Sequence, residues 1–90
     1  MKLLEAVQQI EVLDSDLIIY ARRPWNFDSE VELIAENSND EDRVKAAGFR
    51  YFIEVPMAKE FLEDWRANVI KNPTTQQCCE RLIRYAKYDA

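Results

Sequence analysis

The sequence predicts an α+β fold: a small three-stranded, mainly antiparallel sheet packed with helices, in the order α-β-β-α-β-α-α. Two observations lead to this prediction. Apolar residues recur at helical spacing in some stretches, and in others they alternate or cluster as they do in strands. One glycine and three prolines are too few turn residues for an all-β sandwich or barrel. The length of 90 residues predicts one domain, over residues 1–90.

The first elements are predicted to be a helix and a buried strand. Within residues 2–13, Leu3, Val7 and Ile10 share one helical face, and most polar side chains lie opposite. Turn formers follow, and residues 17–21 are then short, β-branched and nearly all apolar. Such a run is typical of a central strand that is covered on both faces.

A second strand and a short helix are predicted next. Residues 31–36 alternate in character, which indicates a half-exposed strand, and a short connection makes it antiparallel to the first. Ser38 and Glu41 have the spacing of a capping box, which predicts a helix over residues 40–47. Gly48, the only glycine, stands where a helix C-terminus favours a left-handed residue.

The stretch 49–65 carries much of the apolar weight of the chain, as a strand that runs into a helix. Strict alternation would place Tyr51 and Ile53 on one face of this strand and Phe52 on the other. Pro56 suits the first turn of the following helix, where its missing N–H costs nothing. The predicted buried stripe of that helix consists of Ala58, Phe61, Leu62, Trp65 and Val69.

The last helix is predicted from a second capping box, formed by Thr74 and Gln77 just after a helix-breaking Asn-Pro pair. It contains adjacent Cys78 and Cys79, which are poorly placed for a disulfide with each other or for a zinc site. We interpret them as core residues of a protein kept in a reducing compartment, the cytoplasm.

Several kinds of catalytic and metal chemistry are disfavoured by composition. The chain has no histidine, so serine-histidine and cysteine-histidine catalysis within one chain is excluded, and one glycine cannot make a phosphate-binding loop. The acidic run at residues 36–42 lacks the glycine and the bidentate glutamate of a calcium loop. We therefore expect no enzyme, no catalytic residues, no metal site and no cofactor.

The charge is negative and unevenly distributed. The net charge is −5; residues 1–45 carry eleven acidic and five basic groups, and residues 46–90 carry six and seven. The acidic half would repel nucleic acid, although Arg81, Arg84 and Lys87 form a short basic stripe. No apolar run is long enough to span a membrane. The expected partner is a protein, with no nucleic acid and no membrane.

The loop over residues 22–29 is the main candidate binding surface. Arg22 and Arg23, beside Trp25 and Phe27, have the chemistry to hold a carboxylate or phosphate over an aromatic floor, or to form an interface hot spot. The alternative is that the two aromatic residues close the core as a lid while the arginines pair with nearby acids. Under the binding hypothesis, changing Arg23 and Trp25 to alanine abolishes partner capture without unfolding the domain.

Four features together resemble a family of small bacterial single-domain proteins of unknown function. They are the segment from Leu17 to Pro24-Trp25, the Gly48-x-x-Tyr51 entry into a strand, Glu60-Phe61-Leu62, and the ending Tyr85-x-x-Tyr88-Asp89-Ala90. Proteins of this size and charge include immunity proteins that neutralise toxins. The resemblance implies no catalytic residues and leaves function to the protein's own surfaces.

We therefore expect a small acidic bacterial domain without enzymatic activity that works through protein-protein contacts, including as an immunity-like module. The alternative is a small-molecule or anion-binding domain that uses the loop from Arg22 through Arg23 and Pro24 to Trp25. A homodimer is a further expectation, because a small sheet leaves edges that can pair.

Overall fold

The computed structural model describes residues 1–69 and 71–88, and in them it confirms the α+β fold and the predicted order of elements. None of the helices in this part of the chain is long and apolar enough to cross a membrane. The elements are α1 (Leu3–Gln8), the 3-10 turn η1 (Ile10–Val12), β1 (Leu17–Arg22), β2 (Val31–Ala35), α2 (Asp40–Ala46), β3 (Phe49–Glu54), α3 (Val55–Asn68) and α4 (Thr75–Tyr88).

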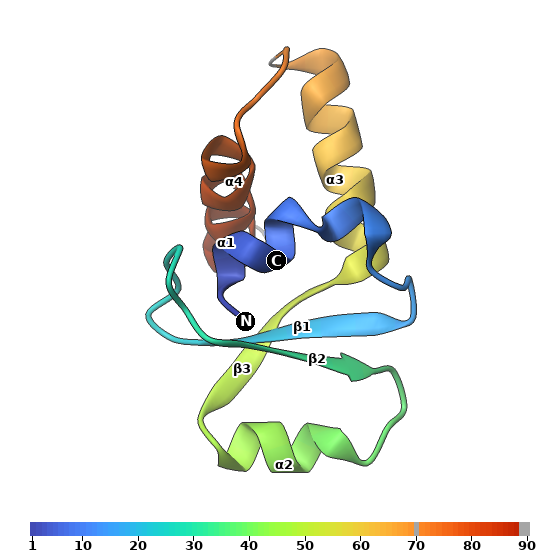
Figure 1. Cartoon of the computed structure of the whole chain (residues 1–90), viewed down its shortest axis with the longest axis vertical. Helices are drawn as coiled ribbons and strands as arrows, with labels where there is room; N and C mark the ends of the chain where they lie inside the picture. Colours follow the sequence, from blue (N-terminus) through green and yellow to red (C-terminus); the bar gives the residue numbers. More distant parts are fainter. Residues whose placement is uncertain (70, 89–90) are drawn as a thin grey trace.

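The sheet has the order β2-β1-β3, and both strand pairs are antiparallel. The apolar strand β1 is therefore central, as its composition predicted. Helices α1, α3 and α4 lie on one side of the sheet, and α2 lies alone on the other (Figure 1). This three-layer arrangement explains why β1 is apolar on both faces.

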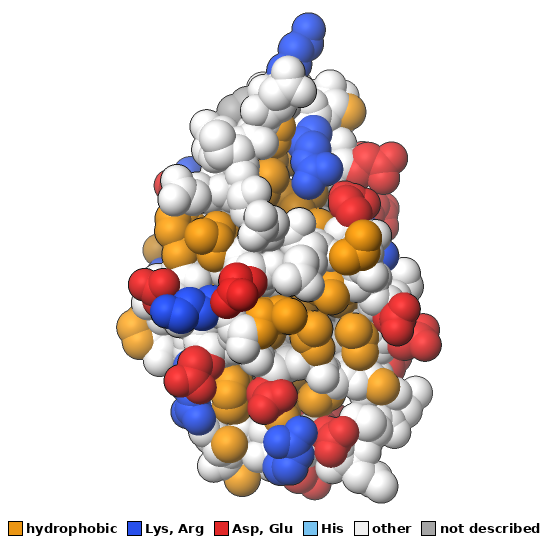
Figure 2. All heavy atoms as spheres, in the orientation of Figure 1, with side chains coloured by type: hydrophobic (Ala, Val, Ile, Leu, Met, Phe, Trp, Pro, Cys, Tyr) orange, Lys and Arg blue, Asp and Glu red, His pale blue; other side chains and the backbone are white. Residues whose placement is uncertain are grey.

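The acidic residues do not gather into one acidic patch on the face shown in Figure 2. Red carboxylate groups are scattered over this face, and several lie beside blue Lys or Arg side chains. The ion pairs among described residues include Lys2 with Asp28 at 3.4 Å and Arg43 with Asp40 at 3.5 Å. The acidic first half of the chain is thus dispersed in space on this side of the molecule.

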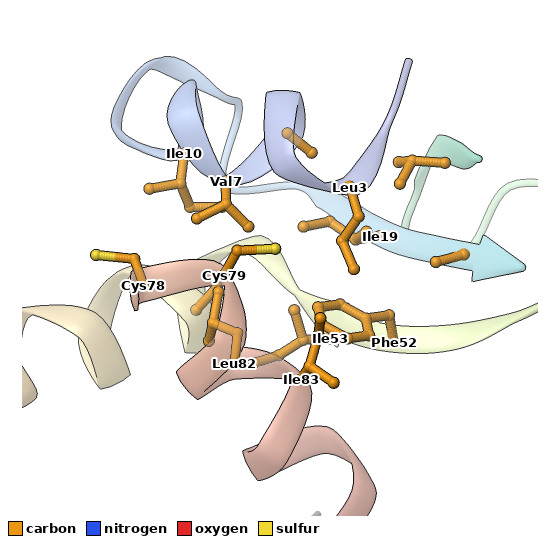
Figure 3. Close-up of a cluster of buried hydrophobic side chains, with 14 of the residues drawn as sticks. Leu3, Val7, Ile10, Ile19, Phe52, Ile53, Cys78, Cys79, Leu82 and Ile83 are labelled. Atoms are coloured by element: carbon orange, nitrogen blue, oxygen red, sulfur yellow. The ribbon is translucent and has the colours of Figure 1, made fainter. Parts of the chain in front are cut away.

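The main core lies between the sheet and the three helices on its first side. Leu3, Val7 and Ile10 project from the first helical segment, as their spacing predicted, toward α4 and the sheet (Figure 3). The opposing side chains are Cys78, Cys79, Leu82 and Ile83 of α4 and Ile19, Phe52 and Ile53 of the sheet. Both cysteines are buried and unbridged, in agreement with the prediction that they are core residues.

A second, smaller core lies under α2. Val44 of α2 is fully buried against Tyr20, Ile34 and Phe49, which point to this side of the sheet. The prediction that residues 31–36 form a half-exposed strand is wrong for Ile34, which is only 4% exposed. Val44 of the short helix covers that position, while Glu32 of β2 and Glu36, which follows β2, stay in contact with water.

A β-bulge in β3 overturns the strict alternation predicted for residues 49–55. Ile19 of β1 pairs with Ile53, but Tyr20 pairs with Tyr51, so Phe52 has no residue directly opposite it. The extra residue lets Phe52 and Ile53, 1% and 3% exposed, both reach the main core. Tyr51 turns to the α2 side, where its ring lies edge-on to Tyr20 at 6.0 Å.

The two predicted capping boxes have different outcomes. At α4 the box is confirmed: the Thr74 N–H donates to Gln77 Oε1 at 2.8 Å, and the Gln77 N–H donates to Thr74 Oγ1 at 3.1 Å. At α2 the prediction is wrong, because Asn39 is the N-cap and Ser38 Oγ accepts only a long bond, 3.4 Å, from Asp40.

The side chain that would complete the box at α2 is engaged elsewhere. Glu41 accepts a bond from Lys45 Nζ at 2.7 Å, one turn along the helix. This bond lowers the pKa of Glu41 and raises the pKa of Lys45. The ion pair between Glu41 and Lys45, four residues apart, thus replaces the hydrogen bond from the Ser38 N–H to Glu41 that a capping box requires.

The buried stripe predicted for α3 is partly wrong. Val55, Ala58 and Leu62 are fully buried, and Phe61 and Trp65 are half-buried against the main core. Val69, however, follows the last helical residue and is 73% exposed. The stripe continues along the sequence beyond the point where other elements can cover it.

The free edges of the sheet are partly protected. At the start of β2, the Val31 N–H donates to Met1 O at 2.9 Å, and the Leu3 N–H donates to Ser29 O at 2.8 Å. At β3 the bulge breaks the regular edge, and Arg50 Nη1 donates to Phe49 O at 2.9 Å. Bulges and edge cations are common devices against strand pairing between molecules. Dimerisation stays a prediction.

Candidate interaction surfaces

The loop between β1 and β2 places Trp25 in the main core. Its side chain is 8% exposed, and its ring meets the Phe52 ring edge-on at 5.0 Å. The indole Nε1–H donates to Ala21 O at 3.2 Å, which satisfies the one polar group of the side chain. Phe27 is half-buried against the same core, and its carbonyl accepts a bond from Leu4 N–H at 3.1 Å.

The two arginines of the loop point to different neighbours. The Arg22 guanidinium lies over the Phe49 ring at 4.3 Å, and its Nε is 3.4 Å from Glu30 Oε2. The Arg23 guanidinium lies over the Trp25 ring at 4.9 Å and is exposed. The structure therefore separates the pair: Arg22 packs toward β3, and Arg23 stays with Trp25.

The four predicted site residues divide between two surface depressions and the core. Arg23 and Trp25 line a depression of about 520 Å³, and Arg22 and Arg23 line a neighbouring one of about 270 Å³. Phe27 lines neither of them. The smaller depression also contains Asp28 and Glu30, so its positive charge is offset there.

Hydrogen bonds within the loop hold its shape. The carbonyl of Pro24 accepts bonds from Asn26 Nδ2 at 3.1 Å and from Ser29 Oγ at 3.2 Å. The Asn26 N–H in turn donates to Ser29 Oγ at 2.9 Å. Ser29 is buried, and it ties both ends of the turn together. The exposed residues of the loop are thus presented on a fixed backbone.

A second surface lies along α3 and α4, and we call it the aromatic groove. Two overlapping depressions, of about 200 and 580 Å³, share Trp65, Arg81 and Arg84. Val69 and Tyr88 line the larger depression and are 73% and 78% exposed. The side chains that define the groove are Trp65, Val69, Arg81, Arg84 and Tyr88.

The floor beside the aromatic groove is built from stacked side chains. The Phe61 and Tyr85 rings are 4.7 Å apart between centroids, and the Arg81 guanidinium lies 5.1 Å over Phe61. Sequence reasoning found the basic residues of this groove as a stripe but assigned Trp65 to the buried face. The sequence pattern that indicates this surface is the stripe of basic residues together with Tyr85 and Tyr88 in the same helix.

The remaining reactive groups are buried or dispersed. Burial, with a smaller effect of Cys78, raises the pKa of Cys79 to about 12, so its thiol stays protonated at neutral pH. Burial also raises the pKa of Tyr20, as does the adjacent Glu41. Among residues 1–69 and 71–88, no group of three or more acidic or cysteine side chains is arranged to hold a metal ion.

No protein-family model, curated protein or solved structure matches this chain. The resemblance to small bacterial domains therefore stays a prediction, which rests on the four sequence features alone. Residues of two of those features have structural roles: Trp25 is a core residue, Gly48 has a left-handed backbone and Tyr51 flanks the bulge. The final residues of the last feature, Asp89 and Ala90, lie outside the described residues.

Proposed function

We propose that this chain is a bacterial protein-interaction domain without enzymatic activity, and that its main contact surface is the aromatic groove. The observation that carries the proposal is the exposure of Val69 and Tyr88, at 73% and 78%, beside Trp65 in one groove. Large apolar side chains grouped on a surface mark sites of contact with other proteins more often than chance.

The composition of the groove supports the same function. Tryptophan, tyrosine and arginine dominate the energetics of protein interfaces, and here all three types line one surface. Arg81 is held against Phe61, so less of its conformational freedom is lost when a partner binds. Among the described residues, the two arginines outnumber Glu80, the one carboxylate that lines either depression, which favours an acidic partner segment.

A helix is the partner conformation that suits this surface best. Two long helices with a groove between them accept an amphipathic helix that inserts apolar side chains at positions i, i+3 or i+4, and i+7. Acidic residues along the edge of that helix would meet Arg81 and Arg84. The partner we propose is therefore a protein with an exposed, acidic, amphipathic helix.

The experiment compares capture by the native domain and by two variants with matched charge changes. Partners are captured from a native bacterial lysate, identified by mass spectrometry, purified and titrated by calorimetry. Arg84→Ala with Tyr88→Ala removes two exposed groove residues, and Arg43→Ala removes another exposed arginine from α2, on the other side of the sheet.

We expect the groove variant to weaken binding about tenfold or more, as hot-spot truncations do, and the Arg43 variant to bind as the native chain does. Circular dichroism confirms that both variants are folded. Equal binding by all three proteins would mean that the partner docks elsewhere. A partner that is basic, or that loses no affinity as salt is raised, would contradict the charge argument.

An immunity-like role is the narrower form of the same proposal. It follows from the resemblance to small bacterial domains and from the expected cytoplasmic location. The partner would then be a toxin, and the domain would suppress its activity in a mixture of purified proteins. A captured partner without toxic activity would leave the interaction role and remove the immunity role.

A further inference from the structure

We propose that the depression between the Pro24 loop and the last turn of α4 binds a small organic carboxylate with an apolar body. This depression is lined by Arg23, Pro24, Trp25, Ala86 and Lys87 and has a volume of about 520 Å³. That volume falls within the range of small-molecule sites. The inference is independent of the aromatic groove and of any protein partner.

The lining has the charge pattern of an anion site. Two cations stand beside three apolar residues, and no carboxylate of the described residues lines the depression. Five other cations have close acidic partners, in the pairs Lys2–Asp28, Arg22–Glu30, Arg43–Asp40, Lys45–Glu41 and Arg66–Glu11. The neighbouring depression contains Asp28 and Glu30, whereas the two cations of this one are offset by no carboxylate of the described residues in its lining.

Arg23 is oriented for this role. Its guanidinium lies 4.9 Å over the Trp25 ring, and a guanidinium over a ring can still direct the N–H groups of its own plane to a carboxylate. Trp25 cannot turn away, because its indole N–H is bonded to Ala21 O and its ring is set against Phe52. The core thus fixes the platform on which the arginine rests.

The apolar part of the ligand has a place beside these charges. Pro24, Ala86 and Trp25 line the depression, and apolar atoms make up most of its surface. A ligand such as an aryl or alkyl acid would bury its body there while its carboxylate lies near Arg23 and Lys87. Inorganic phosphate has no such body and gains only the electrostatic part of the interaction.

The loop is ready for binding before the ligand arrives. Asn26 and Ser29 hold the Pro24 carbonyl by hydrogen bonds, and Phe27 anchors the loop to α1 through Leu4. A rigid site spends less free energy on ordering itself, so even a shallow depression can retain a ligand. The neighbouring 270 Å³ depression is unsuitable, because Asp28 and Glu30 would repel a carboxylate.

The test is a titration of the isotope-labelled whole chain, followed by ¹H–¹⁵N NMR. The probes are 4-phenylbutyrate, the neutral 4-phenylbutyramide and inorganic phosphate. We expect phenylbutyrate to shift the Trp25 indole signal and the amide signals of Arg23 and Lys87. The amide and phosphate are each expected to bind about tenfold more weakly, because each lacks one half of the recognised chemistry.

Matched variants identify the residues that bind. Arg23→Gln and Lys87→Gln should each weaken phenylbutyrate binding several-fold, and the double change should weaken it further. Arg22→Gln is the control, since this adjacent arginine is directed to Phe49 and Glu30. All three are surface changes that leave Trp25 in place, and their amide spectra show whether the fold is retained.

Several outcomes would overturn the proposal. These are equal binding of the neutral amide, equal binding of phosphate, an Arg22→Gln effect as large as that of Arg23→Gln, and no shift at millimolar phenylbutyrate. Binding that is lost in the Arg84→Ala, Tyr88→Ala variant would place the acid in the aromatic groove instead. Retained binding in that variant separates this site from the proposed protein interface.

Discussion

Arg22 lies over Gly48, the residue that follows the C-cap of α2: Arg22 Nη1 is 2.7 Å from the position that a Cβ on Gly48 would take. The glycine has φ +96°, in the left-handed region. The guanidinium crosses this gap to lie on Phe49. The end of α2, the central strand β1 and the edge strand β3 therefore meet at Gly48. A glycine there adopts the left-handed backbone conformation without strain and leaves room for the Arg22 guanidinium.

Gly48→Ala should lower the free energy of unfolding by about 1–2 kcal/mol, chiefly through the left-handed backbone. Urea denaturation of the native and variant chains measures this loss. The Arg22→Ala background is the control, because it removes the collision but keeps the dihedral angle. If the cost of Gly48→Ala disappears in that background, the arginine and not the backbone is its source.

Trp25→Ala should destabilise the domain by about 3–5 kcal/mol, the usual cost of emptying a large aromatic position in a core. Arg23→Ala, an exposed change in the same loop, should stay within about 0.5 kcal/mol of the native chain. Thermal and urea denaturation compare the two variants. A Trp25 variant as stable as the native chain would contradict its assignment to the core.

This prediction changes how binding through the loop must be tested. Combining Trp25→Ala with Arg23→Ala would remove a core side chain together with a surface one, so lost capture could reflect unfolding. Changes at Arg23 alone, with Arg22 as the control, keep the core intact.

Thr74→Ala should cost about 1 kcal/mol, because it removes the Oγ1 that accepts the Gln77 N–H at the start of α4. Ser38→Ala should cost less than about 0.5 kcal/mol, because the Ser38 side chain accepts only one long hydrogen bond, from the Asp40 N–H. Denaturation in urea ranks the two changes. Equal effects would show that the different geometries of the two helix starts do not control stability.

The free energy of unfolding should fall as the pH rises from 8 to 10, partly because of Cys79. Its folded pKa of about 12 lies above the ordinary value of 9.0, so in this window the unfolded chain releases a proton that the folded chain keeps. The loss is at most about 1.4 kcal/mol per pH unit for one group. Tyr20 and Tyr51, whose pKa values are also raised, act in the same direction.

Cys79→Ala isolates the cysteine contribution. The variant starts less stable, because it loses buried side-chain volume, but its stability should decline less steeply between pH 8 and pH 10. Parallel urea denaturation at several pH values gives the two slopes. Identical slopes would mean that the thiol ionises equally well in the folded and unfolded chains.

Some local features of the chain could be predicted from the sequence because they depend on interactions between residues that are close in sequence. The spacing of Leu3, Val7 and Ile10, the apolar run of β1, and the box of Thr74 with Gln77 depend on residues close in sequence. The fold class and the order of elements follow from such patterns. The binding hypothesis for the loop stays a prediction; it treated Arg22 and Arg23 as one pair, whereas the structure directs them to different neighbours.

Tertiary structure decided which of the apolar and charged residues are available to a ligand. Periodicity assigns a residue to a face of its own element, but burial depends on whether another element covers that face. Trp25 is buried by Phe52, whose position depends on the bulge, and Ile34 is covered by α2. The neighbouring contacts of Arg22 and Arg23 are likewise set by strands and loops distant in sequence.

The amino-acid sequence by itself therefore determined the α+β order, the start of α4 and the absence of histidine chemistry. Only the packed structure decided that Val69 and Tyr88 stay exposed and that Arg23 and Lys87, 64 residues apart, share one depression. The physical reason is that caps and periodicity act within a few residues, whereas burial and surface chemistry arise from contacts between distant segments.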